Sequence, residues 1–274
     1  VMVHQSRFDA LSVGFVYADG QKRWQAVRNG DFGSHWRVGG QIKFEAPDRE
    51  QPVAGVIFRF ERLTDHGLLR VRFLPESKSS QESAMVAAIV SGALALLLIS
   101  FLYNLTSAVS TGQRVLLWQT SWAGVMIIWG LVWSQLHLIL FPALAGSWSA
   151  QASTLLATLA IALGVLAAIK PMPKDAMPKW MRHTNVLLAV FIAAAGVPLT
   201  LIRESRIVHL DHMLAIIVVL NLLLVTASLV AAWRRGHRHG RDMLIAWSVP
   251  MAALAFISLV NIDTSLWSGG AKLV

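Results

Sequence analysis

The residues with the clearest potential for metal or acid-base chemistry form a short histidine cluster. His209-Leu210-Asp211-His212 offers two imidazoles and a carboxylate within four positions, and zinc accepts both kinds of ligand. A third ligand is not evident, so we predict no metal site. Ser, His and Asp occur without the spacing of a catalytic triad, and no phosphate-binding, dinucleotide-binding or zinc-protease motif occurs. We therefore expect no catalytic residue and no cofactor in this chain.

A group of tryptophans indicates binding instead. Four of them fall within about 60° of arc on a helix with roughly 100° per residue, namely Trp118, Trp122, Trp129 and Trp133. Gln119 and His137 fall together beside that stripe. We take Gln119, Trp122, Trp129 and His137 as candidates for an aromatic cavity that binds an amphiphilic ligand. Helix packing or contact with lipid is the alternative reading of the same stripe.

A second aromatic group lies near the N-terminus. Trp24 and Trp36, with Phe32 between them, have the side chains for a face on which a sugar ring stacks. The alternative is that these rings pack in a core. Trp24 and Trp36 are therefore further ligand-binding candidates.

The tryptophans of 118–133 lie within one of six hydrophobic stretches, and these stretches must position them. Each contains no Lys, Arg, Asp or Glu in its interior, and about 20 residues of helix cross a hydrocarbon core of roughly 30 Å. The predicted spans are 84–103, 115–140, 152–169, 184–202, 213–233 and 243–262. We expect a multi-pass α-helical membrane protein with a six-helix transmembrane bundle over 84–262. The polar residues inside these spans are expected to join helices to one another: Gln135, Asn185, Asn221 and Thr226.

Composition agrees with this architecture. The chain of 274 residues is 55% hydrophobic and 14% charged, contains no cysteine and carries a net charge of +9. A basic excess can indicate nucleic-acid binding, but here it lies in short loops between the spans, where it indicates topology. We therefore predict that the chain is embedded in the lipid bilayer and that it does not bind nucleic acid.

The basic residues predict the orientation. The loops after the first, third and fifth spans hold nine Lys or Arg, and those after the second, fourth and sixth hold three. The positive-inside rule then places the first set of loops in the cytoplasm and the N-terminal part outside. The tail 263–274 would also be outside, at the start of a missing seventh helix. We expect an internal fragment of a longer protein.

Residues 1–76 are predicted to form a small antiparallel β domain, a partial sandwich or jelly roll. Asp19-Gly20 favours a tight hairpin turn, and Gly39-Gly40 interrupts a third strand. Alternation in 53–60 and 68–73 puts Val56, Phe58 and Phe60, and then Leu69, Val71 and Phe73, on the packed face. Upstream strands would complete the domain, and residues 77–83 are predicted as a polar linker.

This layout resembles the bacterial seven-transmembrane receptors with diverse intracellular signalling modules, the 7TMR-DISM family. The resemblance rests on Phe101-Leu102-Tyr103-Asn104-Leu105, the aromatic segment Trp118 to Phe141 and the outer loop containing Gly146. The segments 35–41 and 56–59 are similar to the carbohydrate-binding-like sensory domain of some members. The resemblance implies a bacterial inner-membrane receptor whose N-terminal domain is periplasmic.

The family relationship also implies partners. They are a small-molecule or carbohydrate-like ligand, a cytoplasmic output domain such as a diguanylate cyclase or histidine kinase, and a possible homodimer. A transporter or channel component is the alternative function; it predicts internal repeats and charged residues at mid-membrane, and no charge lies inside the spans. A membrane enzyme would need several titratable residues at one depth, where only His137 is available.

Overall fold

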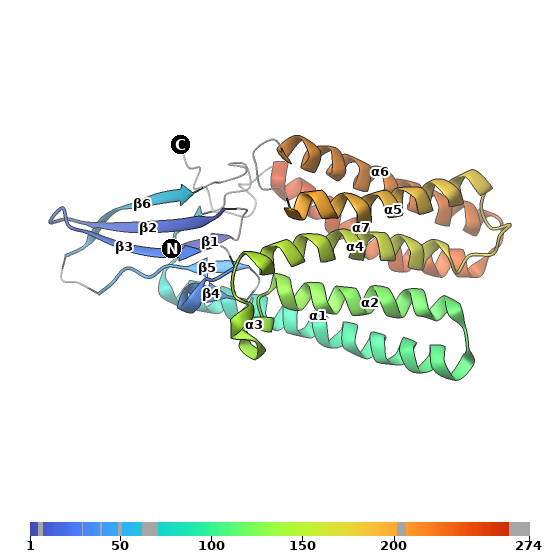
Figure 1. The fold of residues 1–274 in the computed structure, drawn as a ribbon, viewed down its shortest axis with the longest axis horizontal. Helices are drawn as coiled ribbons and strands as arrows, with labels where there is room; N and C mark the ends of the chain where they lie inside the picture. Colours follow the sequence, from blue (N-terminus) through green and yellow to red (C-terminus); the bar gives the residue numbers. More distant parts are fainter. Residues whose placement is uncertain are drawn as a thin grey trace. The chain divides into compact units, whose positions relative to one another are not determined.

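The computed structural model describes residues 1–4, 8–28, 30–38, 40–48, 51–61, 71–201 and 207–262. The chain divides into two compact units, which we describe separately. The first comprises 1–96, 127–154 and 200–208, and the second comprises 97–126, 155–199 and 209–274. The first unit holds every described strand, and the second holds most of the residues in the long helices (Figure 1).

The strands of the first unit form two antiparallel sheets. One has the order β4-β5-β1-β7, built from β4 (Trp36–Arg37), β5 (Gln41–Lys43), β1 (Met2–His4) and β7 (Val71–Arg72). The other has the order β3-β2-β6, built from β3 (Lys22–Arg28), β2 (Ala10–Tyr17) and β6 (Val53–Glu61). A short 3-10 helix η1 (Gly33–His35) precedes β4.

The two sheets share one hydrophobic core. Leu11, Val13 and Phe15 alternate along β2 and are buried, because successive side chains of a strand point to opposite faces. They pack in one cluster with Ile42 and Phe44 from the other sheet. The predicted partial sandwich is confirmed.

The predicted turn at Asp19-Gly20 is present, and the strand predicted to be interrupted at Gly39-Gly40 is two strands. Gly20 has a φ of 79° and donates its N–H to the Tyr17 carbonyl at 2.9 Å, which closes the β2–β3 hairpin. Gly40, with a φ of 70°, separates β4 from β5. Both positions need the left-handed conformation that glycine adopts without strain.

Alternation is confirmed in β6 but fails at the end of β7. Val56, Phe58 and Phe60 pack against the core, whereas Ile57 is 39% exposed. Phe73 was expected on the packed face and is 54% exposed. The reason is that β7 ends at Arg72, so the period-two pattern no longer governs the next residue. Leu69 lies outside the described residues.

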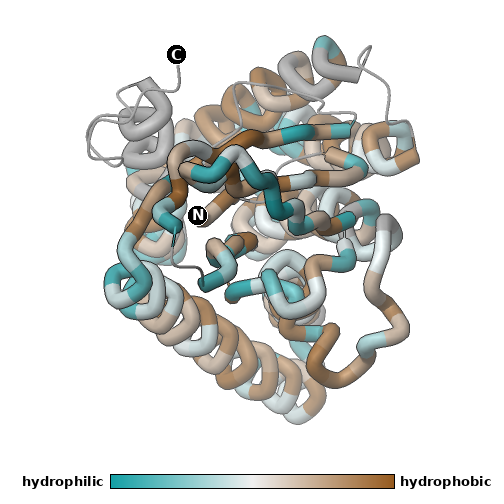
Figure 2. The backbone as a smooth tube through the Cα atoms, turned by 90° about the vertical axis from the view of Figure 1, so that its left-hand side faces the viewer, coloured by the Kyte–Doolittle hydropathy of each residue, from teal (hydrophilic) through white to brown (hydrophobic). Residues whose placement is uncertain are grey.

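Six long helices follow the sandwich. They are α1 (Glu76–Thr111), α2 (Arg114–Trp133), α4 (Ser147–Ile169), α5 (Lys179–Leu201), α6 (Ile207–Arg234) and α7 (Arg238–Ile262). Among the described residues, five of the six, all except α7, are long and apolar enough to cross a membrane. Figure 2 shows hydrophobic residues along the helical coils and hydrophilic residues concentrated in strands and turns. The chain is a β domain followed by a helical transmembrane region.

Within the second unit each long helix packs on the next one in sequence. A Cβ built on Gly124 of α2 would lie 3.1 Å from the Phe101 ring of α1, and one on Gly164 of α4 would lie 3.1 Å from Trp122 of α2. Small residues allow such close approach of helices in lipid. Hydrogen bonds join the later pairs: Asn185 of α5 to Ser228 of α6 at 2.9 Å, and Trp247 of α7 to Thr226 of α6 at 3.2 Å.

The second predicted span, 115–140, is wrong as a continuous helix. Helix α2 ends at Trp133, Gln135 has a φ of 59°, and a separate short α3 (His137–Leu140) follows, then a 3-10 turn η3 (Pro142–Leu144). A left-handed residue just past the last turn is a common way for a helix to end. The Ser134 hydroxyl donates to the Gly130 carbonyl at 2.6 Å and satisfies part of that end.

The predicted linker 77–83 is helical instead, because α1 begins at Glu76. The Glu76 carboxylate lies in the first turn, where the helix dipole favours negative charge. The Arg72 guanidinium donates to both oxygens of Glu82 at 2.9 Å, which ties the new helix to the strand before it. The polar composition of 77–83 predicted a loop, but these residues form the first two turns of α1.

Candidate functional site

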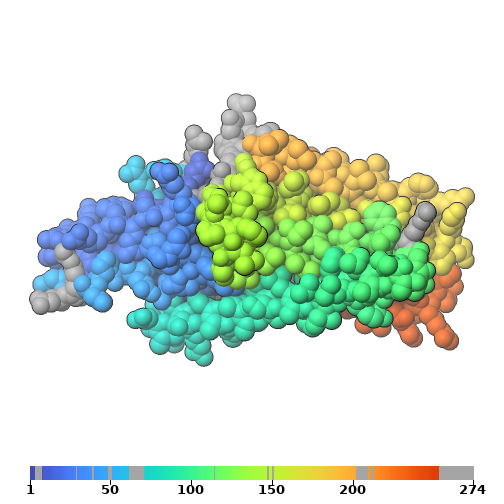
Figure 3. Space-filling model, turned by 60° about the horizontal axis from the view of Figure 1, so that its bottom comes forward, coloured from blue at the N-terminus to red at the C-terminus, as the bar shows by residue number. Residues whose placement is uncertain are grey.

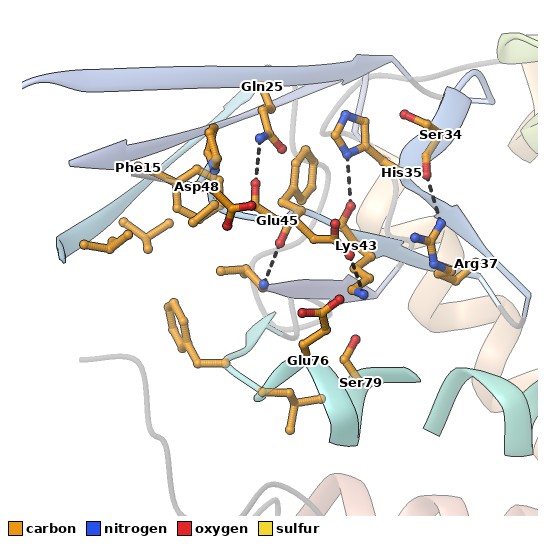
Figure 4. Close-up of a pocket in the computed structure, with 18 residues that line it drawn as sticks. Phe15, Gln25, Ser34, His35, Arg37, Lys43, Glu45, Asp48, Glu76 and Ser79 are labelled. Atoms are coloured by element: carbon orange, nitrogen blue, oxygen red, sulfur yellow. Dashed lines mark hydrogen bonds and ion pairs between the residues drawn. The ribbon is translucent and has the colours of Figure 1, made fainter. Parts of the chain in front are cut away.

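A pocket of about 830 Å³ opens in the first unit between the strands and the start of α1 (Figure 4). Its polar walls come from β3, η1 and the β4–β5 segment and from the first turn of α1. Its apolar walls include Phe15 of β2 and the rings of Phe44 and Phe73. The polar lining residues that Figure 4 labels are Gln25, Ser34, His35, Arg37, Lys43, Glu45, Asp48, Glu76 and Ser79.

Hydrogen bonds preorganise the strand side of this pocket. The Gln25 side-chain amide donates to the Glu45 carbonyl at 2.7 Å, while the Gln25 Oε1 is buried and has no partner among the described residues. His35 stacks on Phe44 with ring centroids 4.8 Å apart, and its Nδ1 lies 3.0 Å from the Lys43 carbonyl. A carbonyl only accepts, so this nitrogen carries the hydrogen.

Charges of both signs line the pocket. Lys43 forms an ion pair with Glu45, and this neighbour holds the pKa of the Glu45 carboxyl below its usual range. Arg37 donates to the Ser34 carbonyl at 2.9 Å, which fixes η1 beside β4. The combination of aromatic rings with donors and acceptors suits a polar, uncharged ligand better than a simple ion.

The opposite wall of the pocket is the first turn of α1. Glu76 and Ser79 both line it. Ser79 is buried and its hydroxyl lies 3.2 Å from the sulfur of Met2 in β1. This turn is therefore part of the sandwich as well as the beginning of a membrane-crossing helix.

Trp36 lies next to the pocket and contacts the end of α2. Its indole N–H donates to the backbone carbonyl of Ser134 at 3.0 Å, across 98 positions of sequence. A second contact lies nearby in the sequence, because the Gly146 N–H donates to the Gly30 carbonyl at 2.7 Å. Both contacts fall within the first unit. Trp36, predicted as a sugar-binding ring, thus serves as a link between β4 and the end of α2.

Trp24 and Phe32 do not join Trp36 in a single face. Trp24 is 50% exposed, and its ring lies over Gly14 of the neighbouring strand, where a Cβ would come within 3.0 Å of three ring atoms. Phe32 belongs to the buried core. The structure leaves Trp24 as a lone exposed platform on β3.

The tryptophan stripe of α2 is divided between the two units. Trp129 stacks on Trp133 with ring centroids 5.8 Å apart, and both belong to the first unit. His137 is also in the first unit, where its Nδ1 lies 3.1 Å from the Leu131 carbonyl and its Nε2 lies 3.4 Å from the Ser149 hydroxyl. Both nitrogens thus lie within hydrogen-bonding distance of groups in the α2–α4 connection.

Gln119 and Trp122 line a different cavity, of about 380 Å³, in the second unit. Four helices contribute to it. The lining residues are Ser100 and Asn104 of α1, Gln119 and Trp122 of α2, Gly164, Ala167 and Ala168 of α4, and Met243, Ala246, Trp247, Val249 and Pro250 of α7. The predicted aromatic cavity is thus formed around only two of its four candidate residues.

Sequence reasoning missed the polar residues of the sandwich pocket. Gln25 alternates with Val27 on the inner side of β3, and Lys43 follows the buried Ile42. The signal in the sequence that could have indicated a pocket is a polar residue, Gln25, on the same face of a strand as a buried one. Gln and Lys are common residue types that do not by themselves indicate a binding site, and only the fold brings these two residues beside α1. No group of three or more potential metal ligands occurs among the residues that the structure describes.

A family model described as 7TM diverse intracellular signalling matches residues 86–270. No curated protein and no solved structure matches the chain significantly. The family match spans more than half of the chain and runs from within α1 to beyond the end of α7, over helices of which five are candidate membrane spans. The chain therefore belongs to the 7TMR-DISM family and is a transmembrane receptor or sensor module.

Proposed function

We propose that this chain is the sensing and membrane-spanning part of a bacterial inner-membrane receptor. The sandwich faces the periplasm and binds a small-molecule or carbohydrate-like ligand. The binding event is passed through the helices to a cytoplasmic output domain, a diguanylate cyclase or a histidine kinase, in the longer protein. The basic loops of 170–182 and 234–241 support this orientation.

One observation carries the proposal: one wall of the sandwich pocket is the first turn of α1, and another is hydrogen-bonded to the end of α2, and both helices can cross a membrane. Glu76 and Ser79 line the pocket from the first turn of α1. Ser34 and Arg37 line it on either side of Trp36, which is bonded to the end of α2 at Ser134. A ligand that moves these walls moves the ends of α1 and α2, and a receptor needs this kind of element with two arrangements.

Helix α1 is well suited to carry a displacement. It runs without a break for 36 residues, which is about 54 Å at 1.5 Å per residue. No glycine or proline lies in its first four turns, 76–90, so that part is stiff. Figure 3 shows the face on which α1 is exposed, and none of its most apolar window is buried in the described structure. Leu94 and Phe101 of this helix lie close to Gly130 and Gly124 of α2, so a displacement of α1 acts on α2 as well.

Binding is tested first. The purified chain in lipid nanodiscs is titrated with a panel of neutral mono- and oligosaccharides, and its thermal unfolding is followed. We expect a saturable rise in melting temperature for at least one sugar, and loss of that rise in Gln25→Leu, which removes the unpaired buried Oε1. Gln51→Leu is the matched control, because Gln51 is exposed and does not line the pocket. No shift with any sugar would contradict the carbohydrate-like ligand.

The relay is tested without knowing the natural ligand. The chain has no cysteine, so Glu76→Cys with Ser34→Cys allows bifunctional maleimides of graded length to bridge the pocket. We expect bridging to change hydrogen exchange of amides near the far end of α1, residues 104–111, and in α3. Trp36→Phe should abolish the change in α3 and leave that in α1. Unchanged exchange in both segments would refute the relay.

A further inference from the structure

The cavity of the second unit lies at one end of its helices. Asn104 is near the end of α1, Gln119 near the start of α2, Ala168 near the end of α4 and Met243 near the start of α7. The loops at that end are 112–113, 170–178 and 235–237. Its volume of about 380 Å³ is within the range of small-molecule sites. The sandwich pocket belongs to the other unit, so this is a separate site.

The cavity wall contains two polar groups that need a partner. Within the described part of the chain no hydrogen bond is made by the Gln119 amide or the Trp122 indole N–H, and both residues line the cavity. The other polar groups are engaged: Trp247 donates to Thr226 at 3.2 Å, and the Asn104 amide donates to Ser100 at 3.3 Å. In hydrocarbon an unpaired donor is costly. The two groups on α2 therefore favour a ligand with a hydrogen-bond acceptor.

The remaining walls are apolar and accessible. Gly164 of α4 lies close against the Trp122 indole, since a Cβ there would be only 3.1 Å from the indole nitrogen, and Ala167 and Ala168 continue this wall with small apolar side chains. Ser100 on α1 and Ala246 on α7 are exposed. The cavity thus opens between α1 and α7 toward the surroundings of the helices, which in a bilayer are lipid chains.

A positive charge lies close to the same end. The Lys170 ammonium is 6.0 Å from the centre of the Trp118 ring. Trp118 directly precedes Gln119, and Lys170 lies two residues after Ala168. A cation at this position favours an anionic head group at the mouth of the cavity.

We propose that this cavity binds the acyl group of a membrane amphiphile. The carbonyl or carboxylate oxygen accepts hydrogen bonds from the Trp122 indole N–H and the Gln119 amide, and the alkyl chain lies between α1 and α7. A free fatty acid and the acyl ester of an anionic phospholipid present the same chemistry. The site gives the receptor module a second input, from the membrane, that is independent of the sandwich pocket.

The test uses the whole chain in nanodiscs with two photoactivatable probes, a diazirine palmitic acid and a diazirine phosphatidylglycerol. We expect saturable labelling of the peptides that contain Trp122 and Trp247. Labelling by the free acid alone assigns the fatty acid, and labelling by the phosphatidylglycerol assigns the ester. Gly164→Leu fills the cavity and should reduce labelling at least about fivefold. Gly92→Leu is the matched control, because nothing lies within 4 Å of a Cβ at that exposed position of α1.

A second variant separates binding from folding. Gln119→Leu with Trp122→Phe removes the two hydrogen-bonding groups and keeps the apolar walls, so the apparent affinity should fall about tenfold. Labelling that is spread evenly over exposed helices and insensitive to both cavity variants overturns the proposal. It is also overturned if the peptides stay unlabelled because another segment of the chain or a second copy closes the cavity, which cysteine cross-linking to α1 and α7 detects.

Discussion

Polar side chains inside the helices differ in whether their hydrogen-bonding groups have partners on another helix. Asn185 donates to the Met181 carbonyl and to the Ser228 hydroxyl, both at 2.9 Å, and so joins α5 to α6 as predicted. Thr226 accepts from Trp247 and joins α6 to α7. Asn221 is fully buried in α6, yet neither atom of its amide has a partner in the described structure. The prediction of helix-joining residues is confirmed for Asn185 and Thr226.

Small residues set the distance between α4 and α5. A Cβ built on Gly196 would lie 2.0 Å from the Thr158 hydroxyl oxygen, which is closer than any real contact. We expect Gly196→Ala to push the helices apart and to lower the free energy of unfolding by about 1–3 kcal/mol. The measurement is thermal unfolding in detergent.

Two controls accompany this variant. Gly92→Ala has open space around it and should leave stability unchanged or raise it by up to about 1 kcal/mol through helix propensity. Adding Thr158→Ala to Gly196→Ala removes the nearest atom and should recover part of the loss. Equal melting temperatures for Gly196→Ala and wild type would show that α4 and α5 do not pack this closely.

At the scale of elements, the break between α2 and α3 is the main departure from a simple row of spans. Gln135 has a φ of 59° and is 1% exposed, and neither atom of its side-chain amide has a partner among the described residues. A positive φ costs free energy in a residue that has a Cβ. A buried side-chain amide without a partner also costs free energy, because it has lost its hydrogen bonds to water. Such strain persists where the surroundings enforce it, and here the adjacent Ser134 carbonyl is bonded to Trp36.

The strain at this break can be measured with two substitutions. Gln135→Gly and Gln135→Ala both remove the unpaired amide, but only glycine adopts the left-handed conformation without cost. We expect Gln135→Gly to be more stable than Gln135→Ala by about 1 kcal/mol, as measured by chemical or thermal unfolding in one detergent. Alanine equal to or better than glycine would mean that the backbone at 135 is not held at positive φ.

At the scale of the whole molecule, the charge distribution predicts a single orientation in the bilayer. Ala18 lies in the β2–β3 turn and Lys174 in the loop between α4 and α5, and both are exposed. We expect Ala18→Cys to react with a membrane-impermeant maleimide added to spheroplasts, and Lys174→Cys to react only after lysis. The wild-type chain has no cysteine and gives the background. Labelling of Lys174→Cys in intact spheroplasts would reverse the proposed topology.

The sequence by itself determined the class of this protein. The spans, the strand alternation of β2 and β6 and the glycine turns depend on local patterns of a few residues to about 20, which act before any tertiary contact forms. Gln119 and Trp122 lie within one unbroken helix, as the helical wheel of α2 assumes, and they line one cavity.

Only the tertiary structure showed where each helix begins and ends and which distant residues lie together. The wheel could not hold for His137 beyond the left-handed Gln135, and the polar residues 77–83 form the first turns of α1, where Arg72 pairs with Glu82. The sandwich pocket also depends on contacts between distant segments: Gln25 of β3 and Glu76 of α1 line one space although 51 positions separate them. No local pattern encodes such a meeting, because it depends on how two sheets and a helix pack around one shared core.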